Sequence, residues 1–171
     1  YVLPPAVNGN GQAALSSFDE TQAVFDQFIY GYRYDGRKRL VEKKIPGKGW
    51  EFMVYNKLDQ VVLSQDAVQR GKSPQEWLYS KYDALGRVVA TGIYPHAGTT
   101  ADTGTVPLRT SKNALQAALD DQAQLIANGD VSISLWESRP GADYDGKSFP
   151  QTGGNLLTVN YYDNYDFTGN S

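Results

Sequence analysis

The side chains that most often carry catalysis are scarce in this sequence. It contains one histidine, His96, and no cysteine, so thiol chemistry is excluded and any histidine-based triad depends on His96 alone. His96 stands between Pro95 and Ala97-Gly98, which predicts a solvated loop position. No serine occupies the centre of a Gly-x-Ser-x-Gly pattern, and no glycine-rich segment with Lys-Ser or Lys-Thr leads into a predicted helix. We therefore expect no enzymatic activity and no bound cofactor.

Two carboxylate patterns remain as candidates for metal or acid–base chemistry. Asp143-x-Asp145-Gly146 is similar to the first positions of a calcium-binding loop, but the acidic residue that completes such a loop is missing, and the same pattern forms ordinary turns. Asp120 and Asp121 are adjacent on a predicted helix and point to different sides, so they do not form the facing pair of a glycosidase. We expect no metal site.

Aromatic residues are the one excess that could bind a ligand. The chain has 12 tyrosines and 3 tryptophans, and Trp50, Trp77 and Tyr79 fall in segments with the alternation of strands. We favour packing against the sheet as their role. The alternative is an open aromatic stripe on a sheet face, on which the rings of a glycan stack.

The elements that position these residues are easiest to define in segment 77–89. Trp77, Tyr79 and Lys81 alternate with the residues between them, as in an extended strand. Asp83 then opens a turn, because its carboxylate can accept hydrogen bonds from N–H groups a few residues on. Gly86 supplies the positive φ that the turn needs. The segment therefore predicts a complete β-hairpin.

The pattern of this hairpin recurs along the chain without gaps. A Tyr-Asp or Tyr-Asn pair opens each copy, and a tryptophan precedes two of the tyrosines by five residues. Recurrence within about 20–50 residues indicates an array of one supersecondary unit. The framework residues are Tyr34, Asp35 and Arg39 in the first copy, Trp50, Tyr55 and Asn56 in the second, Trp77, Tyr82, Asp83, Gly86 and Arg87 in the third, and Tyr162 and Asp163 in a looser fourth.

The motif Tyr-Asp-x-x-Gly-Arg-x-Val, with an aromatic residue five positions before the tyrosine, resembles the YD repeat of the bacterial RHS family. The resemblance covers residues 28–94 well and 156–167 weakly. Lys38, Asp59 and Asp166 occupy the glycine position. We expect those turns to bend differently or to carry about 1 kcal/mol of left-handed strain.

The resemblance implies a mainly β fold of consecutive antiparallel YD-repeat hairpins in a curved sheet, with one inserted amphipathic helix. It also implies a structural, non-catalytic role in a shell that encloses and delivers a C-terminal effector or toxin. The expected partners are flanking YD repeats and the enclosed effector of the same polypeptide, and the expected location is secreted or on the bacterial cell surface. The self-cleaving Asp-Pro-x-Gly motif of the family has no match. The alternative function is a cell-surface adhesin module that binds glycan through Trp50, Trp77 and Tyr79.

Composition limits the remaining classes of function. The chain has 171 residues, 40% of them hydrophobic, and a net charge of −3, as expected of a folded domain. Its basic residues gather in 31–72 but alternate between sides of the predicted hairpins, so we expect no nucleic-acid partner. No apolar run is long enough to predict a membrane span. Because the chain begins at Tyr1 without Met or a leader pattern, we expect it to be a piece of a longer polypeptide.

The expected organisation has four parts. Ser17-x-x-Glu20 predicts the capped start of a short helix, and Leu115, Leu119 and Ile126 predict a helix from a Ser111 cap to Asn128-Gly129. The parts are an N-terminal arm with the short helix at 1–30, three hairpins at 31–94, a loop and the inserted helix at 95–130, and a returning hairpin at 131–171 with strands at 131–139 and 156–162 before the fourth copy.

Overall fold

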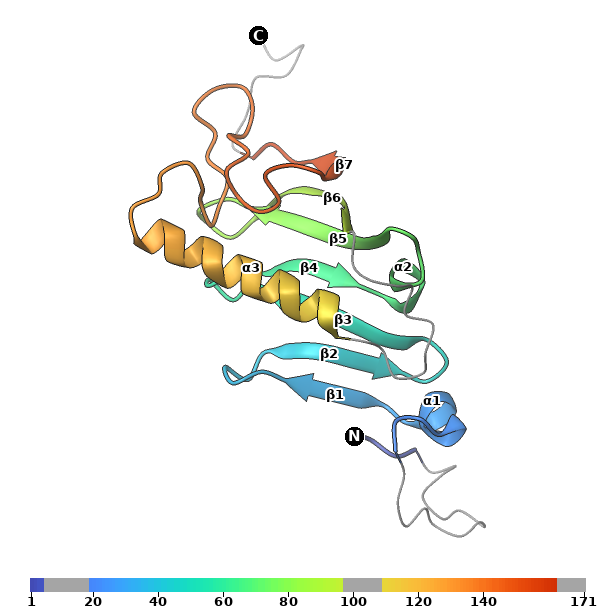
Figure 1. The fold of residues 1–171 in the computed structure, drawn as a ribbon. Helices are drawn as coiled ribbons and strands as arrows, with labels where there is room; N and C mark the ends of the chain where they lie inside the picture. Colours follow the sequence, from blue (N-terminus) through green and yellow to red (C-terminus); the bar gives the residue numbers. More distant parts are fainter. Residues whose placement is uncertain (5–18, 97–108, 163–171) are drawn as a thin grey trace.

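The computed structural model describes residues 1–4, 19–96 and 109–162. These residues form one unclosed sheet of seven strands, each antiparallel to its neighbours and arranged in chain order (Figure 1). The expectation of a mainly β fold is confirmed at this level. The strands are β1 (Gly31–Tyr34), β2 (Leu40–Ile45), β3 (Gly49–Tyr55), β4 (Val61–Gln65), β5 (Gln75–Tyr82), β6 (Val88–His96) and β7 (Asn155–Val159).

Alternation along the strands builds the core. Trp50, Phe52 and Val54 follow one another at every second position of β3, and each is at most 1% exposed. Because side chains two apart in a strand share a face, this face is the one that the rest of the chain covers. Trp77 and Tyr79 of β5 join the same buried cluster.

Helix α3 (Thr110–Ala127) crosses that face of the sheet (Figure 1). Leu115 and Leu119 lie one turn apart and are buried in the core. Gln116 between them accepts a hydrogen bond from the Tyr55 N–H (3.1 Å) and donates one to the Tyr55 carbonyl (2.9 Å). The helix is therefore fixed to β3 by both apolar and polar contacts.

The ends of α3 differ in how well the sequence predicts them. At the C-terminal end, Gly129 has φ +94° and its N–H bonds the Ile126 carbonyl, while Asp130 N–H bonds the Leu125 carbonyl, so the predicted stop is confirmed. At the other end the predicted Ser111 cap is wrong. Ser111 is a buried residue inside the helix, and the N-cap position is Arg109.

The N-terminal arm carries helix α1 (Ala23–Phe28), which is shorter than predicted. Ser17 lies outside the described residues, and the Glu20 carboxylate instead bonds Arg33 and the Tyr1 hydroxyl. Lys44 of β2, which is 0% exposed, donates to the carbonyls of Phe25 (2.9 Å), Asp26 (2.8 Å) and Ile29 (3.3 Å). This buried ammonium satisfies the C-terminal end of α1 and holds the arm on the sheet.

A second short helix, α2 (Ala67–Arg70), was not predicted. Asp66 accepts a bond from the Gln69 N–H (2.7 Å), and the Gln69 side chain accepts one from the Asp66 N–H (3.0 Å). The spacing Asp66-x-x-Gln69 is the sequence signal that could have revealed this capping box.

The three turns lie at the expected positions. In each of them an N–H closes a bond to the carbonyl three residues earlier: Lys38 to Asp35 (2.9 Å), Asp59 to Asn56 (3.3 Å) and Gly86 to Asp83 (3.0 Å). Lys38 (φ 63°), Asp59 (φ 60°) and Gly86 (φ 80°) all adopt the left-handed conformation. Lys38 and Asp59, which stand in the glycine position, therefore form the same turn as Gly86. Both carry the backbone strain of the left-handed conformation.

Gly86→Val is expected to lower the free energy of unfolding by about 1–2 kcal/mol, because a β-branched residue at positive φ is strained. The matched control is Gly36→Val in the first turn, where an added Cβ meets no atom within 4 Å and φ lies outside the left-handed range. Urea denaturation of both variants measures the difference. Equal losses at the two positions would contradict the left-handed role of Gly86.

The predicted strand over 131–139 is wrong. Val131 is 81% exposed, and the segment is irregular apart from one parallel bridge in which the Glu137 N–H bonds the Tyr82 carbonyl (2.7 Å). Within the described residues, no strand pairs with Val131, Ile133 and Leu135. The contacts of Glu137 with Tyr82 and Lys81 hold this segment against the face of the sheet and not along one of its edges. Strand β7 confirms the later predicted strand in a shorter form.

Candidate functional site

The three turns share one side-chain arrangement. Each opens with an aspartate or asparagine whose Oδ1 accepts two backbone N–H groups, two and four residues further on. Because the side chain satisfies these donors, the turn conformation is set locally. The pairs are Arg37 and Arg39 on Asp35 (both 2.9 Å), Leu58 and Gln60 on Asn56 (both 3.0 Å), and Leu85 and Arg87 on Asp83 (both 2.9 Å).

The side chain four residues after the opening residue closes each turn. Arg39 Nε bonds Asp35 Oδ2 at 2.7 Å, and Arg87 Nε bonds Asp83 Oδ2 at 2.6 Å. Burial alone raises the pKa of each aspartate, but the backbone N–H and guanidinium of the arginine outweigh it and hold the pKa below its usual range. In the second turn, Asn56 Nδ2 donates to the Gln60 side chain (2.7 Å), so the link is kept without charge.

Tyrosine hydroxyls connect each turn to the next one. The acceptor is always the carbonyl five residues after the opening aspartate or asparagine. Tyr55 donates to Leu40 (2.8 Å), Tyr82 to Val61 (2.8 Å) and Tyr162 to Val88 (3.1 Å). We call these three bonds the tyrosine ladder.

Arginine guanidinium groups reinforce two of the three connections. The Arg39 guanidinium lies 4.7 Å from the centre of the Tyr55 ring, and that of Arg87 lies 4.5 Å from the Tyr162 ring. Such contacts stabilise exposed sites by about 0.5–1 kcal/mol. Tyr162, which the sequence assigns to a looser fourth copy, thus makes the same kind of contact as Tyr55 and Tyr82, whereas Asp163 and Asp166 lie outside the described residues.

Glu137 holds the segment after α3 against the sheet. Its side chain is 1% exposed and pairs with Lys81 of β5 at 2.8 Å. It also accepts bonds from the Gly146 N–H (2.6 Å), the Ser148 N–H (3.1 Å) and the Ser148 hydroxyl (2.6 Å). Burial alone raises the pKa of Glu137, but the hydrogen bonds from Lys81 and Ser148 and the charge of Lys81 hold it below its usual range. Glu137 is therefore a buried, ionised carboxylate.

The loop around this carboxylate has an anion-binding sequence. Residues 141–148 match the Gly-x4-Gly-Lys-Ser spacing of phosphate-binding loops, although Phe149-Pro150 and not a helix follows them. The Gly146 and Ser148 N–H groups bind Glu137, and Lys147 Nζ donates to the Val131 carbonyl (3.0 Å). The anion in this loop is thus a carboxylate of the chain itself, and no nucleotide site results.

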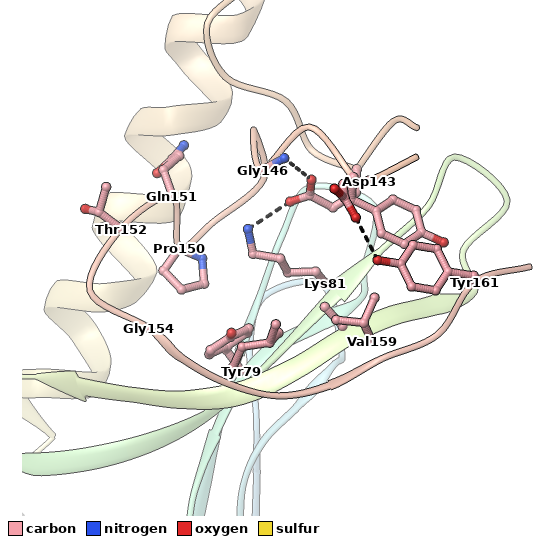
Figure 2. Close-up of a pocket in the computed structure, with 14 residues that line it drawn as sticks. Tyr79, Lys81, Asp143, Gly146, Pro150, Gln151, Thr152, Gly154, Val159 and Tyr161 are labelled. Carbon is pink, nitrogen blue, oxygen red and sulfur yellow. Dashed lines mark hydrogen bonds and ion pairs between the residues drawn. The ribbon is translucent and has the colours of Figure 1, made fainter. Parts of the chain in front are cut away.

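A pocket of about 380 Å³ lies between this loop and the ends of β5, β6 and β7 (Figure 2). Tyr79 and Val159 lie on its sheet side, and Pro150, Gln151 and Thr152 lie on the opposite side. The lining residues are Tyr79, Lys81, Ala90, Glu137, Asp143, Tyr144, Gly146, Pro150, Gln151, Thr152, Gly154, Leu156, Val159 and Tyr161.

Two tyrosines shape one end of this pocket. The rings of Tyr144 and Tyr161 stack at 5.6 Å between centres with planes 11° apart. The Tyr161 hydroxyl donates to Asp143 Oδ1 (3.0 Å) and the Tyr144 hydroxyl to the Asn160 carbonyl (2.8 Å). The Arg139 guanidinium lies 5.7 Å from the Tyr161 ring. These contacts hold the rim of the pocket in one arrangement.

The favoured packing role of Trp50, Trp77 and Tyr79 agrees with the structure, and the alternative of an open aromatic stripe does not. Trp50 is 1% exposed and Trp77 is 0% exposed, so neither indole presents a face on which a sugar ring can stack. In the described part of the chain, both indole N–H groups lack a hydrogen-bond partner. Tyr79 is 3% exposed and reaches the pocket. The alternation correctly indicates that the three residues share a face, but that face is the covered one.

The carboxylates of the calcium-like pattern do not converge. Asp143 accepts the Tyr161 hydroxyl, and Asp145 Oδ1 accepts the Ser138 N–H (3.1 Å). Within residues 1–4, 19–96 and 109–162, no group of three or more histidine and acidic side chains could hold a metal ion. Asp120 pairs with Lys57 at 2.9 Å on the exposed side of α3.

His96 is not the solvated loop residue that the sequence predicts. It is the last residue of β6, pairs with Gln75 and stacks on Tyr94 at 6.3 Å. Burial lowers its pKa. Pro95, which suggested a loop, lies inside β6, where it pairs with Glu76 of β5.

No family model matches this chain, and neither a curated protein nor a solved structure matches it. Of the described helices, none has the length and apolar composition that a membrane span requires.

Proposed function

We propose that this chain is a structural, non-catalytic segment of a YD-repeat shell of the RHS type, which encloses and delivers a C-terminal effector or toxin. The observation that carries the proposal is the tyrosine ladder. Each turn offers a carbonyl, and in two of three cases an arginine, to the tyrosine of the next hairpin. Contacts of this kind between nearest neighbours are the source of stability in repeat arrays.

The first tyrosine of the series supports the same proposal. Tyr34 is 62% exposed, against 8% for Tyr55, and in the described residues its hydroxyl has no acceptor. It stands at the end of β1, the first strand of an unclosed sheet. A preceding repeat would supply both the strand partner and the carbonyl that Tyr34 lacks. Flanking repeats of the same polypeptide are therefore the partners that we propose, in a curved wall that is secreted or on the bacterial surface.

The ladder predicts which tyrosine hydroxyls stabilise the chain. Tyr82→Phe is expected to lower the free energy of unfolding by about 0.5–1.5 kcal/mol, because the Val61 carbonyl loses its donor. Tyr34→Phe, the matched control, is expected to change little. Urea denaturation of the two variants measures this difference.

The same pair of variants tests the proposed shell in a longer protein in which further sequence is joined before Tyr1. If that sequence adds a YD repeat, Tyr34→Phe becomes as destabilising as Tyr82→Phe. Electron microscopy of the longer protein is expected to show a continuous, curved β wall. A Tyr34 hydroxyl that stays without effect, together with an isolated seven-stranded sheet, would overturn the proposal.

The adhesin alternative, glycan stacking on Trp50, Trp77 and Tyr79, has less support. Both indoles are buried in the core with α3 residues Leu115 and Leu119. Neither indole can present a ring face to a sugar while this core is intact.

A further inference from the structure

The floor of the pocket holds two polar groups with unused hydrogen-bonding capacity. Tyr79 is 97% buried, yet its hydroxyl has no partner in the described residues. Lys81 Nζ has three donors and uses two of them, on Glu137 (2.8 Å) and the Ser148 carbonyl (3.0 Å). The Tyr79 hydroxyl is not itself buried: it faces the open space of the pocket, where it is available to a ligand. A ligand with several oxygen atoms in this pocket would accept hydrogen bonds from both groups.

The charges around the pocket select a neutral ligand. Glu137 neutralises Lys81, and its two oxygens are already occupied by four donors. Asp143 adds a second carboxylate at the rim, where one oxygen binds the Tyr161 hydroxyl. A phosphate or carboxylate would be repelled by Asp143, and Lys81, already neutralised by Glu137, would not attract it. The site therefore offers donors at its floor and an acceptor at its rim, to a ligand that carries both kinds of group.

Much of the remaining wall is apolar and the space is small. Pro150, Leu156 and Val159 present C–H surface to the pocket. Its volume of about 380 Å³ is near the lower end of small-molecule sites, which run from about 300 to 1,000 Å³. A ligand with several hydroxyl groups on a compact C–H framework matches both features. An extended peptide matches less well, because it would pair along β7, the last strand of the described sheet, whereas the pocket lies on the face of the sheet.

The pocket is preformed in the chain without a ligand. Glu137 fastens the loop to β5, and glycine at positions 92 and 154 leaves room for the Tyr79 ring, since a Cβ at either position would lie within 3 Å of it. A preformed site loses little conformational entropy on binding.

We infer that this pocket binds a neutral saccharide, with the Tyr79 hydroxyl and Lys81 donating to its oxygens and Asp143 accepting from one of its hydroxyls. This function goes beyond the proposed structural role and uses a different part of the chain from the tyrosine ladder.

Amide NMR spectra of the labelled chain test the inference with defined probes. Cellobiose, lactose and N,N′-diacetylchitobiose are titrated as neutral disaccharides, with sodium acetate and triglycine as the anionic and peptide probes. At least one disaccharide is expected to shift the amide signals of Gly146, Thr152 and Gly154, which line the pocket. Acetate and triglycine are expected to leave them unchanged.

Two variants test whether the disaccharide binds in this pocket. Tyr79→Phe is expected to weaken the disaccharide about fivefold, the effect of one hydrogen bond, and Thr152→Trp to abolish binding by filling the rim. The matched control is Tyr82→Phe, which loses a hydroxyl bonded to the Val61 carbonyl outside this pocket. The amide spectrum of each free variant verifies its fold.

The inference is overturned if none of the three disaccharides shifts these signals, if acetate or triglycine shifts them instead, or if Tyr79→Phe and Thr152→Trp bind like the original chain. Each of these results leaves the ladder measurements unaffected, so failure of the saccharide site and failure of the proposed shell are distinguishable.

Discussion

Glu137→Ala is expected to lower the free energy of unfolding by about 3–5 kcal/mol, one of the two largest effects that the structure predicts. The substitution leaves the ammonium of Lys81, whose side chain is only 11% exposed, without its countercharge. It also removes the acceptor of the Gly146 and Ser148 N–H groups. Urea denaturation measures the loss, and limited proteolysis within 139–147 detects release of the loop.

A double variant separates the charge from the packing. In Lys81→Met with Glu137→Leu, no charge remains buried, so we expect much of the lost stability to return. The Gly146 and Ser148 donors stay unpaired in this variant, which keeps it below the original chain. A double variant as unstable as Glu137→Ala would show that the ion pair is not the cause.

The pKa of Glu137 determines how the free energy of unfolding changes with pH. Its pKa in the folded chain lies below the ordinary value of 4.5, so the unfolded chain binds the proton more readily. Glu137 therefore contributes stability above that ordinary value, and the contribution is lost as the pH falls through the lower pKa of the folded chain. Denaturation at pH 6 and below pH 4 is expected to show this loss in the original chain and a smaller one in Glu137→Gln.

Gly92→Ala is expected to destabilise the chain by about 3 kcal/mol or more. A Cβ at this position would lie 2.3 Å from the Asn155 carbonyl oxygen and 2.5 Å from the Cε1 and Cζ atoms of Tyr79. The first of these is a backbone atom of β7, so the strand itself must move. Overpacking of a filled site typically costs about 1–3 kcal/mol, and more where backbone must shift.

The matched control for this prediction is Gly141→Ala, where the added methyl group meets no atom within 4 Å. Thermal or urea denaturation compares the two variants, and hydrogen exchange of the β7 amides reports whether β7 separates from β6. If Gly92→Ala were no more destabilising than Gly141→Ala, the close contact of β6, β7 and Tyr79 would be contradicted.

Local hydrogen bonds explain which features of this protein are predictable from residue types and spacing. The turns at Asp35, Asn56 and Asp83 follow from side-chain oxygens that reach N–H groups no more than four residues away. The strands beside them follow from alternation, and the end of α3 from Asn128-Gly129. Each of these features depends on contacts within one short segment, which is why residue types and spacing predict it.

Contacts between distant segments determine which face of the sheet is covered and where the pocket lies. Lys81 and Glu137 are 56 residues apart in the chain, and no local pattern pairs them. Alternation places Trp50, Trp77 and Tyr79 on one face but does not say what packs against it, so the sequence left both a buried and an open face tenable. It also predicted a strand at 131–139, because alternation cannot report that a partner strand is missing. Burial and long-range ion pairs arise only when distant segments meet, and here they produced both the covered core and the pocket.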